Sequence, residues 1–171
     1  MISQDRAEEL FPVVDEEGKQ IGSATRGECH SGSMLLHPVV HLHVFNSRGE
    51  LYLQRRPLWK DIQPGRWDTA VGGHVDLGED ILSALQREAY EELGIAGFQP
   101  EPLPSYVFQS QLERELVYPF RTIWDAPIQP SDETDGGRFW SGQEIQENLG
   151  KGIFTPNFEQ EWKRIQKCWN V

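Results

Sequence analysis

The sequence predicts an α+β protein in which helices pack against a mixed β-sheet. Short strand-type segments separated by turn residues recur along the chain, and two longer segments have the apolar spacing of an amphipathic helix. The length of 171 residues is that of about one domain, and no linker, repeat or low-complexity tract divides it. We therefore expect a single domain over residues 1–171.

The expected strands follow one another in chain order. A hairpin is expected over residues 11–26, where FPVVD and QIGSATR flank the turn EEGK. The later strand segments are rich in apolar and β-branched residues and are bounded by turn residues. Further strands are expected at 39–46, 51–56, 67–75, 105–112 and 116–124.

Three helices complete the expected elements. The first covers 79–93 and ends at Gly94, because glycine is typical of the position after a helix. A short helix is expected around 141–149. A longer one runs from 156 to about 169, with Thr155 as its N-cap.

The last helix carries an apolar stripe. Its apolar residues recur at the spacing of one helix face, which is typical of packing against a core. A homodimer interface is the alternative interpretation of the same stripe. The stripe consists of Phe158, Trp162, Ile165 and Trp169.

Charge and composition exclude several classes of partner. The formal net charge is −11 and the isoelectric point is about 4.9, whereas nucleic-acid polymers and anionic membranes require a cationic surface. No apolar run approaches the roughly 18 residues of a transmembrane helix, and the start MISQDRAEEL lacks the apolar stretch of a signal peptide. Cys29 and Cys168 cannot form a disulfide framework. We expect a soluble, cytoplasmic protein.

The helix expected over 79–93 has three carboxylates at the edge of its apolar stripe. At about 100° per residue, Glu88, Glu91 and Glu92 fall beside this stripe, whereas a solvated acidic face would fall opposite it. Two carboxylates about 5 Å apart repel each other by roughly 3 kcal/mol at an effective dielectric constant of about 20. Oxygen ligands in this number suit Mg²⁺ or Mn²⁺. The stripe comprises Ile81, Leu82, Leu85, Ala89 and Leu93.

Neighbouring residues fit the same interpretation. Arg87 lies four residues before Glu91 and can pair with it, which moderates the repulsion. Gly72 and Gly73 let the backbone approach a metal-bound phosphate, and the N-terminus of the helix adds a positive dipole end. The alternative is an ordinary charged surface helix.

Residues 73–95 resemble the Nudix box of diphosphate hydrolases. That box runs Gly, five residues, Glu, seven residues, Arg-Glu-aliphatic-any-Glu-Glu-any-Gly-aliphatic. Ala89 is the one soft match, because it is smaller than the usual aliphatic residue. The positions of the box are occupied by Gly73, Glu79, Arg87, Glu88, Ala89, Glu91, Glu92, Gly94 and Ile95.

This resemblance implies a Nudix-type α/β/α sandwich and a defined reaction. Water would attack a diphosphate linked to another group, with nucleoside di- and triphosphates as the default substrates. Glu88, Glu91 and Glu92 would bind Mg²⁺ or Mn²⁺, together with the carbonyl oxygen of Gly72. Arg87 would hold the glutamates in place.

A wider resemblance covers roughly residues 12–125 and concerns type I isopentenyl-diphosphate isomerase and its hydrolase-like relatives. That isomerase binds a metal through three histidines and two glutamates, and it holds the diphosphate with an arginine and a lysine. Arg56 and Lys60 match the two cations. The resemblance thus implies a second site, for a first-row metal. The matching ligands are His30, His37, His74, Glu113 and Glu115.

Two positions depart from the isomerase pattern, and a third is left open by the choice between Tyr106 and Phe108. The catalytic cysteine falls on Gly72, which has no thiol for allylic proton transfer. The tyrosine proton donor falls on Tyr106 or Phe108, and the tryptophan that shields the carbocation falls on Asn157. Because the glutamates of the box are complete, hydrolysis is expected. The alternatives are isomerisation or hydrolysis of an isoprenoid diphosphate, and a non-catalytic module that senses a nucleotide.

Residues outside the box complete the candidate site. Glu113 and Glu115 alternate on an expected strand, so either can supply the catalytic base, or both can lie at a solvated sheet edge. Trp67 can stack on a substrate base or belong to the core. Cys29 stands beside His30 and is either a ligand or a buried, neutral cysteine.

Overall fold

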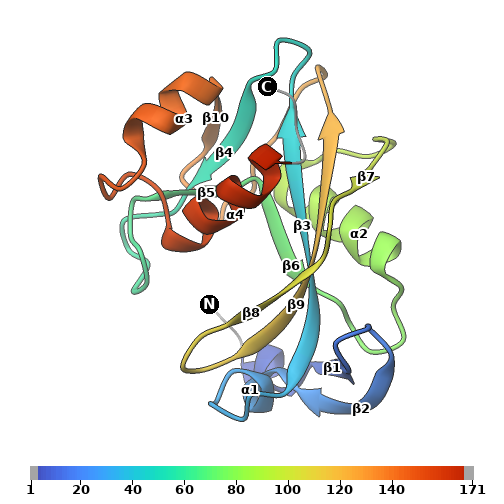
Figure 1. The fold of residues 1–171 in the computed structure, drawn as a ribbon. Helices are drawn as coiled ribbons and strands as arrows, with labels where there is room; N and C mark the ends of the chain where they lie inside the picture. The colour runs from blue at the N-terminus through green and yellow to red at the C-terminus, as the bar shows by residue number, and fades with distance from the viewer. Residues whose placement is uncertain (1–3, 168–171) are drawn as a thin grey trace. The chain divides into compact units, whose positions relative to one another are not determined.

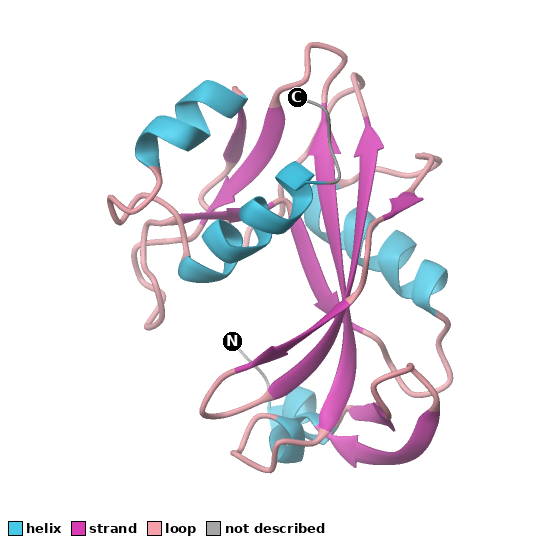
Figure 2. Ribbon diagram, viewed as in Figure 1, coloured by secondary structure: helices cyan, strands magenta, loops and turns pink. Residues whose placement is uncertain are grey.

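The computed structural model describes residues 4–167 and confirms the expected α+β class (Figure 1, Figure 2). The strands are β1 (Leu10–Val14), β2 (Gln20–Thr25), β3 (Leu36–Phe45), β4 (Leu51–Arg55), β5 (Trp67–Thr69), β6 (Val71–His74), β7 (Glu101–Pro102), β8 (Tyr106–Gln109), β9 (Arg114–Ile123) and β10 (Gly137–Trp140). The helices are the short 3-10 helix η1 (Gln4–Glu8), α1 (Arg26–Cys29), α2 (Ile81–Leu93), α3 (Gly142–Asn148) and α4 (Pro156–Lys167).

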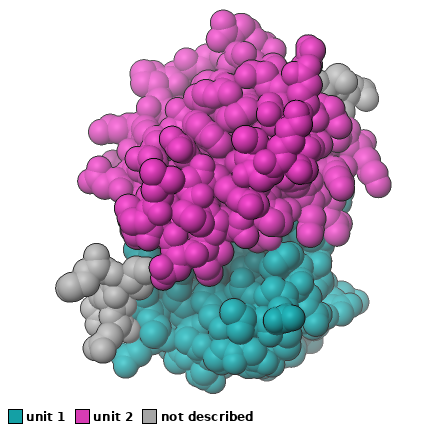
Figure 3. Space-filling model, turned by 90° about the vertical axis from the view of Figure 1, so that its left-hand side faces the viewer, with its two compact units in different colours: residues 1–41, 72–88, 104–119 teal, residues 42–71, 89–103, 120–171 magenta. Residues whose placement is uncertain are grey.

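The chain divides into two compact units, and the first contains the N-terminal hairpin (Figure 3). This unit consists of residues 1–41, 72–88 and 104–119. In it β1 pairs antiparallel with β2, as expected from the sequence, β6 pairs with β3, and β8 pairs antiparallel with β9. A small apolar core joins the hairpin to α1. Its buried members are Phe11, Val13, Ala24 and Cys29.

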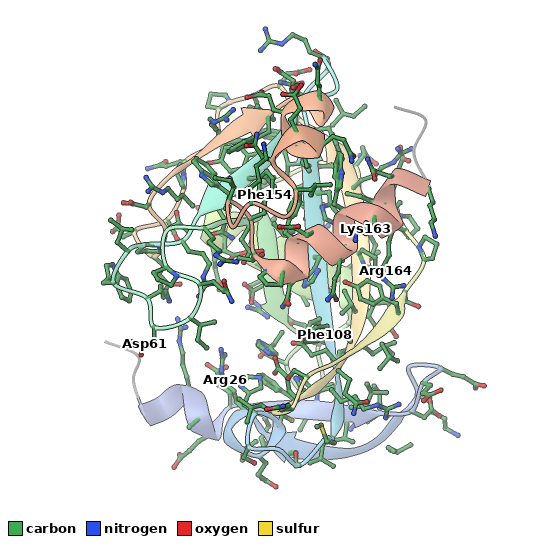
Figure 4. All side chains as sticks on the ribbon, turned by 60° about the vertical axis from the view of Figure 1, so that its left-hand side comes forward. Arg26, Asp61, Phe108, Phe154, Lys163 and Arg164 are labelled. Carbon is green, nitrogen blue, oxygen red and sulfur yellow. The ribbon has the colours of Figure 1, made fainter. Side chains whose placement is uncertain are left out.

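The second unit consists of residues 42–71, 89–103 and 120–171. Its strands lie in the order β10-β4-β3-β9-β7, with β5 paired to β4. In Figure 1, α3 and α4 lie beside β4 and β10. A large apolar cluster fills the space between these elements, with Phe154, labelled in Figure 4, among its fully buried members. The buried residues are Phe45, Leu51, Leu53, Trp140, Ile145, Phe154, Phe158, Trp162 and Ile165.

The apolar stripe of α4 packs into this cluster. Thr155 caps the helix, since its hydroxyl oxygen accepts a hydrogen bond of 3.2 Å from the backbone N–H of Phe158. Phe158, Trp162 and Ile165 are all buried, which confirms core packing for these three side chains. Trp169, the last expected member of the stripe, lies outside the described residues.

The strand expected over 67–75 is wrong as one element, because the structure has two strands there. β5 pairs with β4, whereas β6 pairs with β3. Ala70 separates them and is buried. The chain changes its pairing partner at this residue, and a change of partner interrupts a strand even where the apolar pattern continues.

The start of α2 and one residue of its stripe also differ from expectation. The helix begins at Ile81 rather than at 79, because Asp80 acts as the cap: its carboxylate accepts a hydrogen bond of 2.8 Å from the N–H of Ser83. Leu82 was expected in the apolar stripe but is 50% exposed. Leu82 lies in the first turn of the helix, where the apolar stripe is not fully covered. Leu85, one turn further along, is fully buried.

Within the described residues, none of the helices has both the length and the apolar character needed to cross a bilayer.

Candidate metal centre and the acidic helix

The three histidines and two glutamates expected as metal ligands all belong to the first unit. His30 follows α1, His37 lies in β3 and His74 ends β6. Glu113 precedes β9, and Glu115 lies within that strand. One ligand atom from each histidine and from Glu113 lies within 4.8 Å of the others. The fold of this unit therefore gathers side chains that are far apart in the sequence.

The separations between these atoms suit groups that share one cation. His30 Nε2 lies 3.0 Å from Glu113 Oε2 and 3.2 Å from His74 Nε2. His37 Nε2 lies 3.9 Å from Glu113 Oε2 and 4.0 Å from Glu115 Oε2, and His74 Nε2 lies 3.9 Å from Glu115 Oε2. Ligands bound about 2.1 Å from one ion lie roughly 3–4 Å apart. The donor set therefore fits a first-row metal.

His37 has the protonation state that a metal ligand needs. Its Nδ1 lies 2.9 Å from the carbonyl oxygen of Leu35. A carbonyl oxygen only accepts hydrogen bonds, so Nδ1 carries the proton, and Nε2 of the neutral ring is left with a lone pair. The side chain is fully buried, and Nε2 has no hydrogen-bond partner. A buried lone pair aimed at the cluster is unfavourable unless a cation or a donor reaches it.

Burial and charge favour the same set of protonation states. Burial lowers the pKa of His37 and holds the pKa of His74 well below its ordinary value. Burial raises the pKa of Glu113, but the hydrogen bond and charge of His30 outweigh this effect, and the pKa is lowered. A neutral His37, a neutral His74 and an ionised Glu113 are in the forms that bind metals.

Arg87 ties the start of the acidic helix to the end of β6. Its guanidinium donates two hydrogen bonds of 2.9 Å to the carboxylate of Glu79 and one of 2.8 Å to Oε1 of Glu88. It also donates one of 3.0 Å to the carbonyl oxygen of His74. The hydrogen bonds from Arg87 lower the pKa of Glu79, so this carboxylate stays ionised. The network fixes the Glu88 side chain, which is only 15% exposed.

Gly73 makes room for this carboxylate. A Cβ atom at position 73 would overlap the carboxyl carbon and Cγ of Glu88 and would lie 2.5 Å from its Oε1. At Gly72, the nearest atom to a Cβ would be Cδ2 of His41, at an ordinary contact distance of 3.5 Å. Glycine at 73 therefore lets the Glu88 carboxylate lie directly on the backbone at the end of β6.

The three glutamates of the box lie on α2 but differ in exposure. Glu88 and Glu92 are half-buried. Glu91 is exposed, although the sequence predicts a partly sheltered position for all three glutamates. Ala84 and Leu85, one turn before Glu88, are both fully buried. The helix therefore shelters the flank that carries Glu88, as the sequence predicts.

The residues expected to bind substrate belong to the second unit. Arg56 Nε donates a hydrogen bond of 3.0 Å to the carbonyl oxygen of Ile62, and its side chain is 28% exposed. The ammonium of Lys60 lies 4.9 Å from the centre of the Trp59 ring. The ring of Trp67 is partly buried and packs edge-on against Trp140, with ring centres 5.2 Å apart. Trp67 thus contributes to the core of this unit.

Two features near the cluster were missed or left open by the sequence. Arg26, labelled in Figure 4, lies with its guanidinium 6.0 Å from the ring centre of Phe11, and its charge adds to the effect of burial on the pKa of His74. No sequence signal distinguished this arginine from the others. Cys29 is fully buried in the apolar core beside Phe11, and burial raises the pKa of its thiol to about 11. It is therefore a buried, neutral cysteine, and among the described residues it does not belong to the group of side chains whose ligand atoms lie together.

The chain is similar to known proteins of one family. A model of the NUDIX domain family matches residues 35–158. An isopentenyl-diphosphate Delta-isomerase of Clavibacter sepedonicus is 31% identical over 138 residues, which cover 77% of this chain and 73% of the relative. An uncharacterised Nudix hydrolase of Pseudomonas aeruginosa is 36% identical over 132 residues, which cover 77% of this chain and 78% of the relative.

A solved structure extends the similarity to nearly the whole fold. A protein from Deinococcus radiodurans, solved at 1.9 Å resolution, superposes with a TM-score of 0.77. The match covers 95% of this chain and 100% of the other at 24% sequence identity. This similarity concerns the fold.

Proposed function

The chain belongs to the NUDIX domain family, and from this premise we propose that it is a divalent-metal-dependent hydrolase that cleaves a diphosphate bond in a small molecule. The observation that carries the proposal is the network of Arg87 with Glu79, Glu88 and the His74 carbonyl. This network holds the half-buried carboxylate of Glu88 beside Gly73. The charged residues of an ordinary surface helix would instead point into water.

The carboxylates of the acidic helix are proposed as the ligands of Mg²⁺ or Mn²⁺. Glu88, Glu91 and Glu92, with the carbonyl oxygen of Gly72, offer hard oxygen donors, which these ions prefer. Bound ions would neutralise the charge that develops on the phosphate oxygens. Arg87 keeps the Glu88 carboxylate oriented by donating a hydrogen bond of 2.8 Å to its Oε1.

A carboxylate of β9 is proposed as the base. Attack on phosphorus forms one bond from the water oxygen and breaks the bond to the bridging oxygen, while the water proton passes to a carboxylate. Glu115, or Glu113 just before it, is the proposed acceptor. The side chain of Glu115 is 14% exposed, so water can reach it, and its Oε2 lies near His37 and His74.

We further propose that the histidine cluster holds a second, first-row metal. The ligands are His30, His37, His74 and Glu113, whose ligand atoms lie together, with Glu115 as a fifth where it does not serve as the base. The buried, unpaired Nε2 of His37 is the best support, because a neutral imidazole nitrogen is a favoured ligand of such metals.

Cations outside both ligand sets are proposed to hold the substrate. The guanidinium of Arg26 lies 6.0 Å from the ring centre of Phe11, on which the imidazoles of the cluster pack, so it can attract a diphosphate. Arg56 and Lys60 are the further candidates for the diphosphate, and Trp67 for the attached group. Nucleoside di- and triphosphates are the default substrates.

Isomerisation or hydrolysis of an isoprenoid diphosphate is the second candidate function. It is favoured by the named isomerase among the relatives and by the histidine cluster. Gly72, which supplies no thiol at the position of the isomerase cysteine, counts against isomerisation. A non-catalytic module that senses a nucleotide remains the third candidate.

A screen of phosphate release tests these candidates together. The metal-free protein is incubated with nucleoside phosphates, nucleotide sugars, dinucleoside polyphosphates and prenyl diphosphates, with Mg²⁺ or Mn²⁺ added. We expect metal-dependent phosphate or diphosphate release from at least one class. Formation of dimethylallyl diphosphate from isopentenyl diphosphate, without phosphate release, would replace hydrolysis by isomerisation. Binding without turnover of any class would favour the sensing module.

Replacing Gly73 with Ala is expected to reduce this hydrolysis by about 100-fold, because a displacement of about 1 Å in an active site can cost that much. The new methyl group would overlap the carboxyl group of Glu88, which ends a flexible side chain and can rotate away. Because this movement breaks the hydrogen bond from Arg87 to Glu88, we also expect the free energy of unfolding to fall by about 1–3 kcal/mol. Steady-state kinetics and urea denaturation measure the two effects. Gly22→Ala is the matched control, since the nearest atom to its Cβ would be 4.0 Å away. Wild-type activity in Gly73→Ala would contradict the role given to Glu88.

A further inference from the structure

The three imidazoles of the candidate metal cluster pack on one phenylalanine. Phe11, in β1, is fully buried, and its ring lies parallel to that of His74, with ring centres 4.7 Å apart and an interplanar angle of 4°. It is nearly parallel to the ring of His37, at 5.9 Å and 15°. It meets the ring of His30 edge-on, at 6.3 Å and 60°. One apolar ring from the N-terminal hairpin therefore contacts every histidine of the cluster.

The rings of His30 and His74 need a support of this kind. A histidine that binds a metal usually donates its other ring N–H to a carbonyl or carboxylate, and that hydrogen bond fixes the plane of the ring. His37 has such a bond, to the Leu35 carbonyl. Among the residues that the structure describes, the Nδ1 atoms of His30 and His74 make no corresponding bond. Once Nε2 of each ring is given to a metal, packing on Phe11 is the contact that fixes these two ring planes.

We infer that Phe11 is a positioning residue, which sets the ring planes of His30, His37 and His74 for metal binding. This inference rests on the proposed metal site at the cluster. A phenyl ring suits the role because it attracts the imidazole rings by stacking, yet it has no polar atom to compete for their Nε2 lone pairs. An aliphatic side chain of similar volume would keep the burial and lose the flat surface.

Binding of Co²⁺ to the metal-free protein, followed by absorption spectroscopy, tests this role. Co²⁺ binding that the wild type shows and the variant His74→Ala lacks is assigned to the cluster. Phe11→Leu and Phe11→Met are compared with Val13→Ala as the matched control. Val13 belongs to the same strand and the same apolar core as Phe11. Both Phe11 variants are expected to raise the dissociation constant for Co²⁺ about 10-fold or more and to shift the absorption bands of the bound ion.

The control separates positioning from a loss of stability. Val13→Ala is expected to lower the unfolding temperature while leaving the Co²⁺ dissociation constant and spectrum unchanged. The role of Phe11 would be overturned if both folded Phe11 variants kept the Co²⁺ affinity and spectrum of the wild type. It would also be overturned if Val13→Ala lost as much affinity as they do. Neither result would contradict the proposed metal site. Equal Co²⁺ binding by the wild type and His74→Ala would overturn the proposed metal site, and the role of Phe11 with it.

Discussion

Replacing Glu88 with Gln is expected to reduce diphosphate hydrolysis by about 1000-fold or more while leaving the fold intact. Glutamine keeps the shape and one oxygen that can accept the hydrogen bond from Arg87, but it removes the negative charge. A metal ion contributes several kcal/mol of charge stabilisation in the transition state, and about 4 kcal/mol corresponds to a factor of about 1000 in rate.

The measurement is kcat/KM for the best substrate of the screen, with circular dichroism to check the fold. Glu92→Gln is expected to show a loss of the same order, because Glu92 belongs to the same ligand set. Glu147→Gln, the same chemical change at an exposed position on α3, serves as the control and is expected to keep full activity. Activity in Glu88→Gln within a few-fold of the wild type would contradict the ligand role.

Removing the carboxylate of Glu161 is expected to have the largest effect on stability. Glu161, in α4, is 1% exposed, and its Oε2 lies 3.1 Å from Nε2 of His43, which is fully buried in β3. The two side chains contact each other in the core, although the two atoms lack the alignment of a hydrogen bond. Removing Glu161 leaves the buried imidazole without its partner, at a cost of about 1–3 kcal/mol, and leaves a cavity in the core, which brings the expected cost to about 3–5 kcal/mol.

We therefore expect Glu161→Ala to lower the free energy of unfolding by about 3–5 kcal/mol in guanidinium denaturation. Gln160→Ala changes the adjacent, exposed residue of the same helix and is expected to have little effect. The double variant His43→Leu with Glu161→Leu replaces both partners by apolar groups and should lose less than Glu161→Ala. Equal stability of Glu161→Ala and Gln160→Ala would show that the pair does not stabilise the fold.

The acidic helix could be predicted because its information is local. The spacing of Glu88, Glu91 and Glu92 against the apolar stripe is a property of one helix, and the sequence alone places them on one flank. The same arithmetic failed at Leu82, because burial at the end of a helix depends on what covers that end. It also missed the break at Ala70, where the pairing partner of the strand changes.

The histidine cluster depends on contacts between distant parts of the chain. Its five ligand residues were found through a family resemblance, since nothing in the local sequence links His30 to Glu113. Phe11 was not singled out at all, because a phenylalanine in a hairpin predicts only a core position. Its contacts with three imidazoles follow from the way the hairpin folds onto the first unit.

The central claim is that the carboxylates at 88, 91 and 92 hold divalent cations. Electron paramagnetic resonance of Mn²⁺ added to the metal-free protein tests this claim directly. Only bound Mn²⁺ that Mg²⁺ displaces is counted, because Mg²⁺ prefers sites made of oxygen ligands. The wild type should bind such Mn²⁺, and the folded triple variant Glu88→Gln, Glu91→Gln, Glu92→Gln should not. Undiminished Mg²⁺-displaceable binding in the triple variant would contradict the account.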